Sequence, residues 1–290
     1  MDRTPVSLPA AVLRQYRRFS LYNSPYPAHD RGRAVDLYPD GDVAASPVAG
    51  EVIDTRTVGC PDRPYAADSD HLILVDTGDR VARLLHVDPA VTAGDRVAVG
   101  DPLGELVRSG FFGQWVDNHL HLEFRDADRN PYRASGSLPL RAAVDVEPVA
   151  WDGAGTVVDV GPTHARLDAP GRPDTAEDSF AAVAADDGRP LDGGLPHYSA
   201  GGIFGDAESA DDVSLFGRRV GDAAGRDVAW ADVDVLANGD RVTGLSLFAT
   251  REATVGAKLV TRPDAGDPTF RVGDEVTVTV RPSDDPVRLD

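Results

Sequence analysis

Short apolar runs alternate with turn-forming residues along nearly the whole chain. Stretches rich in Val, Leu and Ile that are bounded by Gly, Pro and Asp are typical of β-strands. One helix is expected, at residues 10–19 (AAVLRQYRRF). The expected strands lie at 34–37, 50–55, 71–76, 80–87, 95–99, 102–107 and 119–125 in the first half, and at 228–235, 242–248, 254–261 and 275–280 in the last third. The pattern therefore predicts an all-β fold.

The organisation of the chain follows from where this pattern weakens. Residues 168–194 are rich in Asp, Gly, Pro and Ala, and we expect a loop there with one strand, at 179–184. A boundary is expected near residues 145–152, in keeping with about 150 residues per domain. The predicted parts are an N-terminal helical segment at 1–22, a β domain at 23–145 and a β-rich C-terminal domain at 146–290 to which no role is assigned.

Arginine and aspartate dominate the charged residues. The chain has 29 basic and 48 acidic residues, a formal net charge of −19, and Lys258 as its single lysine. Such a composition is typical of a halophilic protein, because a Debye length of about 3 Å at molar salt screens most of the repulsion. Nucleic-acid binding needs a basic face, and no basic cluster exceeds Arg17-Arg18 or Arg218-Arg219. We therefore expect no nucleic-acid partner.

Membrane insertion and export are both disfavoured by the sequence. The longest apolar runs, such as Leu72 to Val75, end after a few residues, whereas a membrane-spanning helix needs about 20. The N-terminal residues contain no uninterrupted apolar core followed by a small-residue cleavage site. We therefore expect a cytoplasmic protein without a membrane partner. The single cysteine, Cys60, excludes a cysteine-based zinc cage, so any metal must be bound by His, Asp or Glu.

The most specific local motif is NHLHLEF at residues 118–124. Strand alternation places His119, His121 and Glu123 on one face and the apolar residues between them on the other. Two imidazoles at positions i and i+2 of a strand can point into one site, and this is how sheets present ligands to zinc. The alternative is a pair of surface histidines on an outward face.

Three further residues turn this motif into a constellation. Asp36 lies in AVDL, where its carboxylate points away from two apolar neighbours, and His86 ends the apolar run VARLLHV. His29 precedes Asp36 by seven residues, across a turn-like segment. Each residue alone also has a structural interpretation: Asp36 as a turn or cap carboxylate, His86 as a hydrogen-bonded core histidine, and His29 as a loop residue.

Taken in order, these phrases resemble the lysostaphin and LytM type of zinc metallopeptidases. The resemblance runs from about Asn23 to Arg125 and is strongest in HLHLEF. Its other elements are SPYP, AVDL, SPVAGEVID, LLHV and VTAGDRVAVGDPLGEL. It implies a duplicated hybrid, barrel-sandwich-like β domain, followed here by a second β-rich region.

The resemblance also implies roles for individual residues. Members of that family bind zinc through a His and an Asp four residues apart and through the second His of an H-x-H pair. Asp36 and His121 would then be Zn²⁺ ligands, and His86 and His119 would be catalytic. Gly32 occupies the position of the first ligand.

His29 is the candidate substitute for the missing ligand. Positions 29 and 36 would point to opposite faces of a regular strand, so His29 reaches the site only if residues 30–33 bulge or turn. Without it, Glu123 or His119 would have to supply the third donor.

The resulting functional hypothesis is a zinc metallopeptidase that hydrolyses peptide bonds with metal-activated water, acting on a peptide or protein substrate. The alternative is a catalytically inactive hybrid domain that serves as a binding or scaffold module. SPVAGEVID and VTAGDRVAVGDPLGEL also resemble biotinyl or lipoyl carrier domains, but the only lysine, Lys258, lies far outside the matching region. We expect His164 and His197 to be structural and assign no role to the Gly-rich segment at 193–205.

Overall fold

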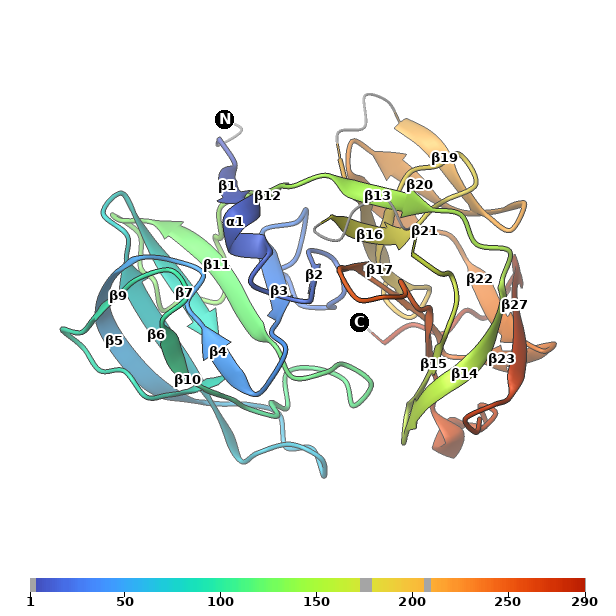
Figure 1. Ribbon diagram of the computed structural model, residues 1–290, viewed down its shortest axis with the longest axis horizontal. Helices are drawn as coiled ribbons and strands as arrows, with labels where there is room; N and C mark the ends of the chain where they lie inside the picture. Colours follow the sequence, from blue (N-terminus) through green and yellow to red (C-terminus); the bar gives the residue numbers. More distant parts are fainter. Residues whose placement is uncertain (1–3, 173–178, 206–209, 290) are drawn as a thin grey trace. The chain divides into compact units, whose positions relative to one another are not determined.

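The computed structural model describes residues 4–172, 179–205 and 210–289. The chain divides into two compact units. Unit 1 comprises Met1–Phe19 and Pro27–Val144, and unit 2 comprises Ser20–Tyr26 and Asp145–Asp290. Strands make up nearly all of the regular structure in both (Figure 1), so the prediction of an all-β chain with a second β-rich region is confirmed.

Unit 1 is built around an antiparallel sheet in which β3, β11, β7, β6, β5 and β9 follow one another, with β2 beside β3. A smaller sheet has the order β4-β10-β8, and β1 pairs with β12 in parallel. The elements are β1 (Val6–Pro9), α1 (Ala10–Leu13), β2 (Arg18–Ser20), β3 (Ala34–Tyr38), β4 (Val43–Ala45), β5 (Gly50–Gly59), β6 (Ser69–Asp76), β7 (Arg80–Leu85), β8 (Val87–Pro89), β9 (Arg96–Val97), β10 (Pro102–Leu106), β11 (Leu120–Asp126) and β12 (Leu140–Ala143).

The two central strands of unit 1 explain why a polar site can form there. Leu120 of β11 pairs with Leu37 of β3, and Leu122 pairs with Val35. These four side chains are fully buried. Because side chains alternate across a strand, the residues between them are directed to the opposite face of the sheet. The apolar positions thus set the register that aligns the polar ones.

Unit 2 contains a curled sheet of 12 strands with the order β19-β20-β21-β18-β17-β24-β26-β15-β14-β27-β22-β23 (Figure 1). Its large apolar core includes Leu191, Leu245 and Trp230. The elements are β13 (Val146–Val149), β14 (Ala154–Gly161), β15 (His164–Leu167), β16 (Phe180–Val183), β17 (Leu191–Leu195), β18 (Ala200–Ile203), β19 (Ala210–Leu215), β20 (Arg218–Ala224), β21 (Asp227–Trp230), β22 (Val233–Ala237), β23 (Asp240–Val242), β24 (Gly244–Leu247), β25 (Ala249–Thr250), β26 (Lys258–Val260), η1 (Pro263–Ala265) and β27 (Glu275–Pro282).

The N-terminal helix is shorter than the sequence pattern predicts. It ends at Leu13, and residues Arg18–Ser20 form β2 instead of a further helical turn. Tyr16 is fully buried and donates its hydroxyl hydrogen to the carbonyl of Ala45 at 2.8 Å, and the Arg17 amide bonds to the carbonyl of Tyr38 at 2.9 Å. Tertiary pairing with the sheet therefore overrides the helical preference of this segment.

Other expected elements differ in extent. The strand expected at 80–87 is interrupted at His86, which has a φ of 69°. The strand expected at 228–235 divides into β21 and β22. The loop expected at 168–194 contains β16 and also the start of β17, while residues 173–178 of it lie outside the described part. Within the described residues, no helix has the length and apolar character to cross a bilayer.

Candidate metal centre

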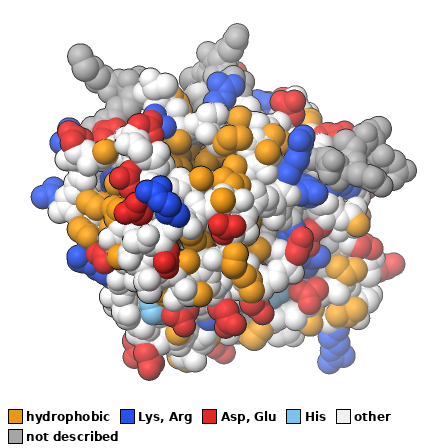
Figure 2. All heavy atoms as spheres, turned by 60° about the vertical axis from the view of Figure 1, so that its left-hand side comes forward, with side chains coloured by type: hydrophobic (Ala, Val, Ile, Leu, Met, Phe, Trp, Pro, Cys, Tyr) orange, Lys and Arg blue, Asp and Glu red, His pale blue; other side chains and the backbone are white. Residues whose placement is uncertain are grey.

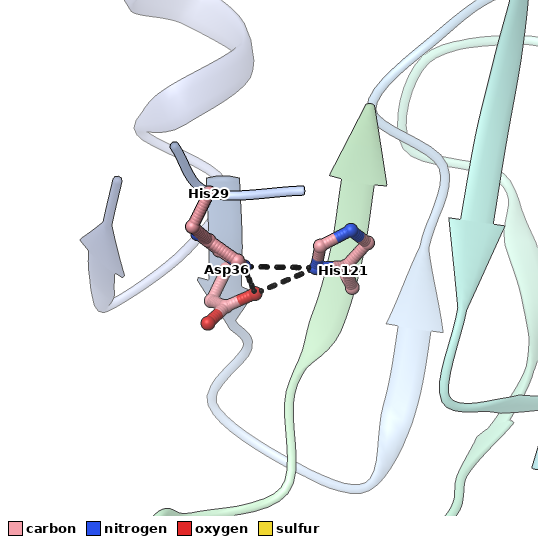
Figure 3. A group of neighbouring side chains, drawn as sticks. All are labelled: His29, Asp36 and His121. Atoms are coloured by element: carbon pink, nitrogen blue, oxygen red, sulfur yellow. Dashed lines mark hydrogen bonds and ion pairs between the residues drawn. The ribbon is translucent and has the colours of Figure 1, made fainter. Parts of the chain in front are cut away.

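Asp36 and His121 face each other across neighbouring strands. They are direct partners in the antiparallel pairing of β3 with β11, and both side chains are buried. The carboxylate Oδ1 of Asp36 lies 3.0 Å from Nδ1 of His121 (Figure 3). The strand register thus brings together two residues that are 85 positions apart in the sequence.

A tight turn adds His29 to this pair. Arg31 and Gly32 both adopt left-handed backbone conformations, with φ values of 58° and 59°. The Gly32 amide donates to the carbonyl of His29 at 3.0 Å, which closes the turn. The chain therefore reverses before β3 begins. Such a turn is needed because residues 29 and 36, an odd number of positions apart, would point to opposite faces of a regular strand. His29 is 4% exposed and points toward Asp36 (Figure 3).

The three donor atoms are spaced as a metal ion requires. Nε2 of His29 lies 3.1 Å from Nδ1 of His121 and 3.3 Å from Oδ1 of Asp36. Two zinc–ligand bonds of about 2.1 Å at the tetrahedral angle separate their donor atoms by about 3.4 Å. Each of the three residues offers one ligand atom, and these atoms lie within 4.8 Å of one another. His29, Asp36 and His121 could therefore hold a metal ion.

Hydrogen bonding alone satisfies this cluster poorly. A ring nitrogen carries at most one hydrogen, so Nδ1 of His121 cannot donate to Nε2 of His29 and to Oδ1 of Asp36 at once. A cation at the centre would accept a lone pair from each atom simultaneously. The donor set of two imidazoles and one carboxylate thus fits a divalent metal better than it fits a proton.

The electrostatics favour the protonation states that a metal needs. Burial alone would raise the pKa of Asp36, but His29, His119 and His121 hold it well below its usual value. Burial lowers the pKa of His121, although the neighbouring Asp36 carboxylate opposes this shift. The carboxylate is therefore ionised and the imidazole neutral near pH 7, as metal coordination requires.

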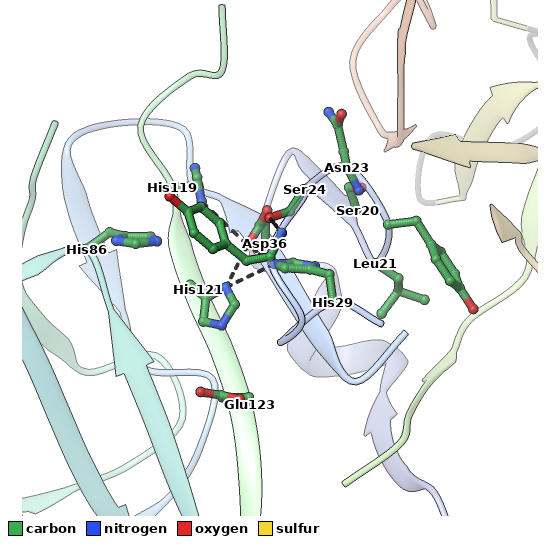
Figure 4. Close-up of polar contacts among 12 residues, drawn as sticks. Ser20, Leu21, Asn23, Ser24, His29, Asp36, His86, His119, His121 and Glu123 are labelled. Atoms are coloured by element: carbon green, nitrogen blue, oxygen red, sulfur yellow. Dashed lines mark hydrogen bonds and ion pairs between the residues drawn. The ribbon is translucent and has the colours of Figure 1, made fainter. Parts of the chain in front are cut away.

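His119 stands beside the three donors. Its Nδ1 donates to the carbonyl of Asp117 at 2.9 Å, and its Nε2 lies 3.4 Å from Oδ1 of Asp36 (Figure 4). Burial lowers the pKa of His119 to about 4. The imidazole is therefore neutral near pH 7, and the backbone contact directs its unprotonated Nε2 into the site.

His86 reaches the same region from the end of β7. Its ring centroid lies 5.0 Å from that of His119 and 5.7 Å from that of His121. Nδ1 of His86 is 2.5 Å from Oδ2 of Asp70, and the backbone amide of His86 donates to the other oxygen of Asp70 at 3.0 Å. The strand β7 ends just before His86, and the left-handed backbone at His86 turns its ring toward the other histidines.

Asp70 was missed by the sequence analysis. It is fully buried, and besides His86 it accepts hydrogen bonds from the hydroxyl of Ser109 at 2.7 Å and the amide of His71 at 2.6 Å. These contacts and His86 lower its pKa against the opposing effect of burial. Asp70 directly precedes His71 in SDHLILVD. The alternation of side chains along this strand could have indicated that the Asp70 carboxylate points inward.

Glu123, considered above as a substitute donor, is engaged elsewhere. Its carboxylate is bound by the guanidinium of Arg83, by Arg125 at 3.0 Å and by the hydroxyl of Ser137. In Figure 4 it lies apart from the His29–Asp36–His121 group. The buried arginines thus hold this carboxylate in an ion-pair network.

The two histidines that the sequence predicts to be structural, His164 and His197, lie in unit 2. His164 is in β15, with Nε2 at 3.2 Å from the exposed carboxylate of Asp159. His197 is fully buried, and burial lowers its pKa to about 3. Neither belongs to a group of metal-ligating side chains within the described residues.

Two family models match the chain in succession. Residues 7–142 match "Domain of unknown function (DUF8155) N-terminal domain", and residues 147–281 match "Domain of unknown function (DUF8155) C-terminal domain". Among solved structures, the NMR solution structure of lysostaphin is similar with 13% sequence identity and a TM-score of 0.27, over 91% of this chain and 96% of the other. No curated protein matches the chain.

Proposed function

We propose that His29, Asp36 and His121 bind a zinc ion and that the protein hydrolyses peptide bonds at this centre. The observation that carries the proposal is the convergence of three buried donor atoms at separations of 3.0 to 3.3 Å. Three protein ligands are the set found in catalytic zinc sites, which keep one coordination position open. When bound there, zinc would polarise a carbonyl group and lower the pKa of a coordinated water to about 7.

His86 is the residue best equipped to take up a proton. With Nδ1–H donated to Asp70, its Nε2 carries the lone pair, and the buried carboxylate of Asp70 would compensate the charge of the imidazolium. His86 therefore can remove a proton from the attacking water and return it to the leaving amine.

His119 has a different role in this proposal. Its low pKa keeps the ring neutral, and the Asp117 carbonyl fixes its orientation. A neutral Nε2 beside Asp36 can accept a hydrogen bond from the attacking water and so orient it toward the substrate. His119 thus aligns the water, and His86 carries the proton.

The choice of a peptide bond is supported by the resemblance of HLHLEF, LLHV and the hairpin phrases to the lysostaphin and LytM type of peptidases. We further propose a peptide or protein substrate in the cytoplasm, and neither a nucleic acid nor a membrane as partner. The net charge of −19 supports the exclusion of nucleic acid, since phosphate backbones would be repelled.

The test is a parallel measurement of zinc content and peptide cleavage. The purified chain is dialysed against zinc, its metal content is measured, and it is incubated with a mixed peptide pool whose products are identified by mass spectrometry. One zinc per chain and metal-dependent cleavage are expected, with cleavage lost on chelation and restored by added zinc. One bound zinc without cleavage would contradict the proposed hydrolysis and support the alternative of a catalytically inactive binding or scaffold module. A chain that binds no zinc contradicts the proposal.

A further inference from the structure

A second polar site lies in unit 1, away from the histidines. It is a pocket of about 700 Å³ lined by four arginines, Arg33, Arg125, Arg129 and Arg133, together with Asp128 and Ser135. Such a gathering of guanidinium groups is unexpected in a chain with 29 basic and 48 acidic residues. Acidic side chains are spread over the surface shown in Figure 2, with basic side chains scattered among them. The pocket is therefore a local concentration of positively charged groups in a chain whose net charge is strongly negative.

Arg33 is the most informative of these residues. It directly precedes β3 and is half-buried. Its Nε is buried without a hydrogen-bond partner, and no hydrogen bond or ion pair joins its side chain to the described part of the chain. An Nε–H group that gives up water without gaining an internal partner is costly. A ligand that supplies acceptor oxygens would remove this cost.

Arg125 holds a neighbouring part of the lining in place. Its side chain is 1% exposed, with one nitrogen donating to Glu123 at 3.0 Å and another to the backbone carbonyl of Arg133 at 3.0 Å. The Leu138 amide also bonds to the carbonyl of Phe124 at 2.9 Å. The segment that carries Arg129 and Arg133 is thus anchored to β11 at both ends. The backbone that carries these two arginines is held in place before any ligand arrives, which lowers the entropic cost of binding.

The charge of the pocket selects the class of ligand. The guanidinium of Arg125 is paired with Glu123, and the one carboxylate in the lining, that of Asp128, lies 3.7 Å from Arg129 on the exposed rim. Arg33 and Arg133 therefore bring positive charge to the pocket that no carboxylate of its lining pairs with. Planar guanidinium groups bind carboxylate and phosphate oxygens in paired hydrogen bonds. A volume of about 700 Å³ lies within the range of small-molecule sites.

We propose that this pocket binds a small multivalent oxyanion, a phosphoryl or polycarboxylate compound. Arg33 and Arg133 contact the anion, and Arg125 acts as a positioning residue through Glu123 and the Arg133 carbonyl. The pocket uses none of the three proposed metal ligands. Arg125 follows His121 by four residues on β11, which corresponds to about 13 Å along the strand. The inference therefore does not depend on the proposed function.

The proposal is tested by isothermal titration calorimetry of the full chain at fixed ionic strength, with inorganic pyrophosphate and citrate as separate probes. One saturable site is expected for at least one probe. Tighter binding of pyrophosphate identifies a phosphoryl ligand, and tighter binding of citrate identifies a carboxylate ligand. Failure of both probes to bind overturns the proposal.

Variants separate this pocket from other anion sites. Arg33→Gln and Arg133→Gln should each weaken binding at least about tenfold. Arg96→Gln, which removes an 80% exposed guanidinium of the same unit, should leave it unchanged. His121→Ala should also retain binding, which rules out chelation at the metal centre. Unchanged affinity in Arg133→Gln, an exposed position that should not disturb folding, contradicts the proposal even if Arg33→Gln proves unstable.

Discussion

Buried histidines occur in both units, but their surroundings differ in kind. In unit 1, His121 lies beside the Asp36 carboxylate, with a second imidazole 3.1 Å from its Nδ1. In unit 2, His197 packs against Gly194 and Gly244, where an added Cβ would come within 2.5 Å of its ring nitrogens. The charged groups that influence the pKa of His197 are guanidinium groups, which lower it further.

The difference shows that burial alone does not make a ligand. Both imidazoles are removed from water, and burial lowers the pKa of both. Only His121 is placed where carboxylate and imidazole lone pairs converge, so only there would a cation be stabilised. His197 is enclosed by backbone and ring atoms, which stabilise a neutral ring. The neighbouring ligand atoms therefore determine whether a buried histidine can bind a metal ion.

Removal of one of the three donors in unit 1 should abolish tight metal binding. Asp36→Ala or His121→Ala should weaken zinc binding about 1,000-fold or more, because the roughly 10–16 kcal/mol of a structural zinc site is shared among few ligands. Competition with a chromogenic chelator measures the affinity. His197→Gln is the matched control and should keep the wild-type value. Equal zinc affinity in the wild type and in Asp36→Ala would show that the surroundings of His121 differ from those of His197 without forming a metal site.

Glu123→Gln separates ion pairing from metal binding within unit 1. Removing one charge of the buried Arg83–Glu123–Arg125 network should lower the free energy of unfolding by about 3 kcal/mol, since the arginines lose their counter-ion. Urea unfolding measures the change. Glu51→Gln, at a surface pair with Arg96, should alter stability by less than about 1 kcal/mol. Loss of zinc at native stability would instead identify Glu123 as a ligand.

His86→Gln should spare zinc and slow peptide hydrolysis about 100-fold, the usual contribution of a general acid–base group. Asp70→Asn should act in the same direction, because the imidazole of His86 would lose the partner that fixes its tautomer. Steady-state kinetics with parallel metal analysis checks both. His71→Gln, on the strand next to Asp70 but outside the cluster, should retain activity. Equal rates for His86→Gln and wild type would exclude His86 from the reaction.

The last effect concerns unit 2 and is the smallest at neutral pH, because it develops only as the pH falls. The pKa of His197 is about 3 in the folded chain and about 6.5 when unfolded, so the unfolded state binds the extra proton between these values. Its contribution to stability is complete above about pH 6.5 and declines by about 1.4 kcal/mol per pH unit as the pH falls toward 3. Hydrogen exchange of unit 2 amides measures this slope. His197→Gln should flatten it; an unchanged slope would show that His197 titrates normally.

The residues on the polar face of the site could be predicted because the direction of each side chain follows from its position along a single strand. Alternation in AVDL and HLHLEF assigns Asp36 and His121 to the faces of two strands, and the apolar residues between fix the pairing. The odd separation of positions 29 and 36 also predicted that a turn is needed to bring His29 to the site, and Arg31 and Gly32 form this turn. These features depend on side-chain direction along single strands, which a sequence records directly.

Features that depend on distant contacts could not be predicted. Asp70 meets His86 only through the pairing of β6 with β7 and the end of β7. Gly201 and Gly202 in β18 read as loop residues, yet an added Cβ would come within 2.2 Å of Trp230 and Tyr22 respectively. These glycines make room for aromatic rings, and a glycine within a strand marks such close approach. The size and position of the rings are set by tertiary packing.

Diffraction at the zinc absorption edge, from crystals grown with zinc, locates the metal ion itself. One strong anomalous peak is expected at about 2.0–2.2 Å from Nε2 of His29, Oδ1 of Asp36 and Nδ1 of His121. A peak bound to other side chains, or none at this position in crystals that contain zinc, would contradict the proposed zinc site.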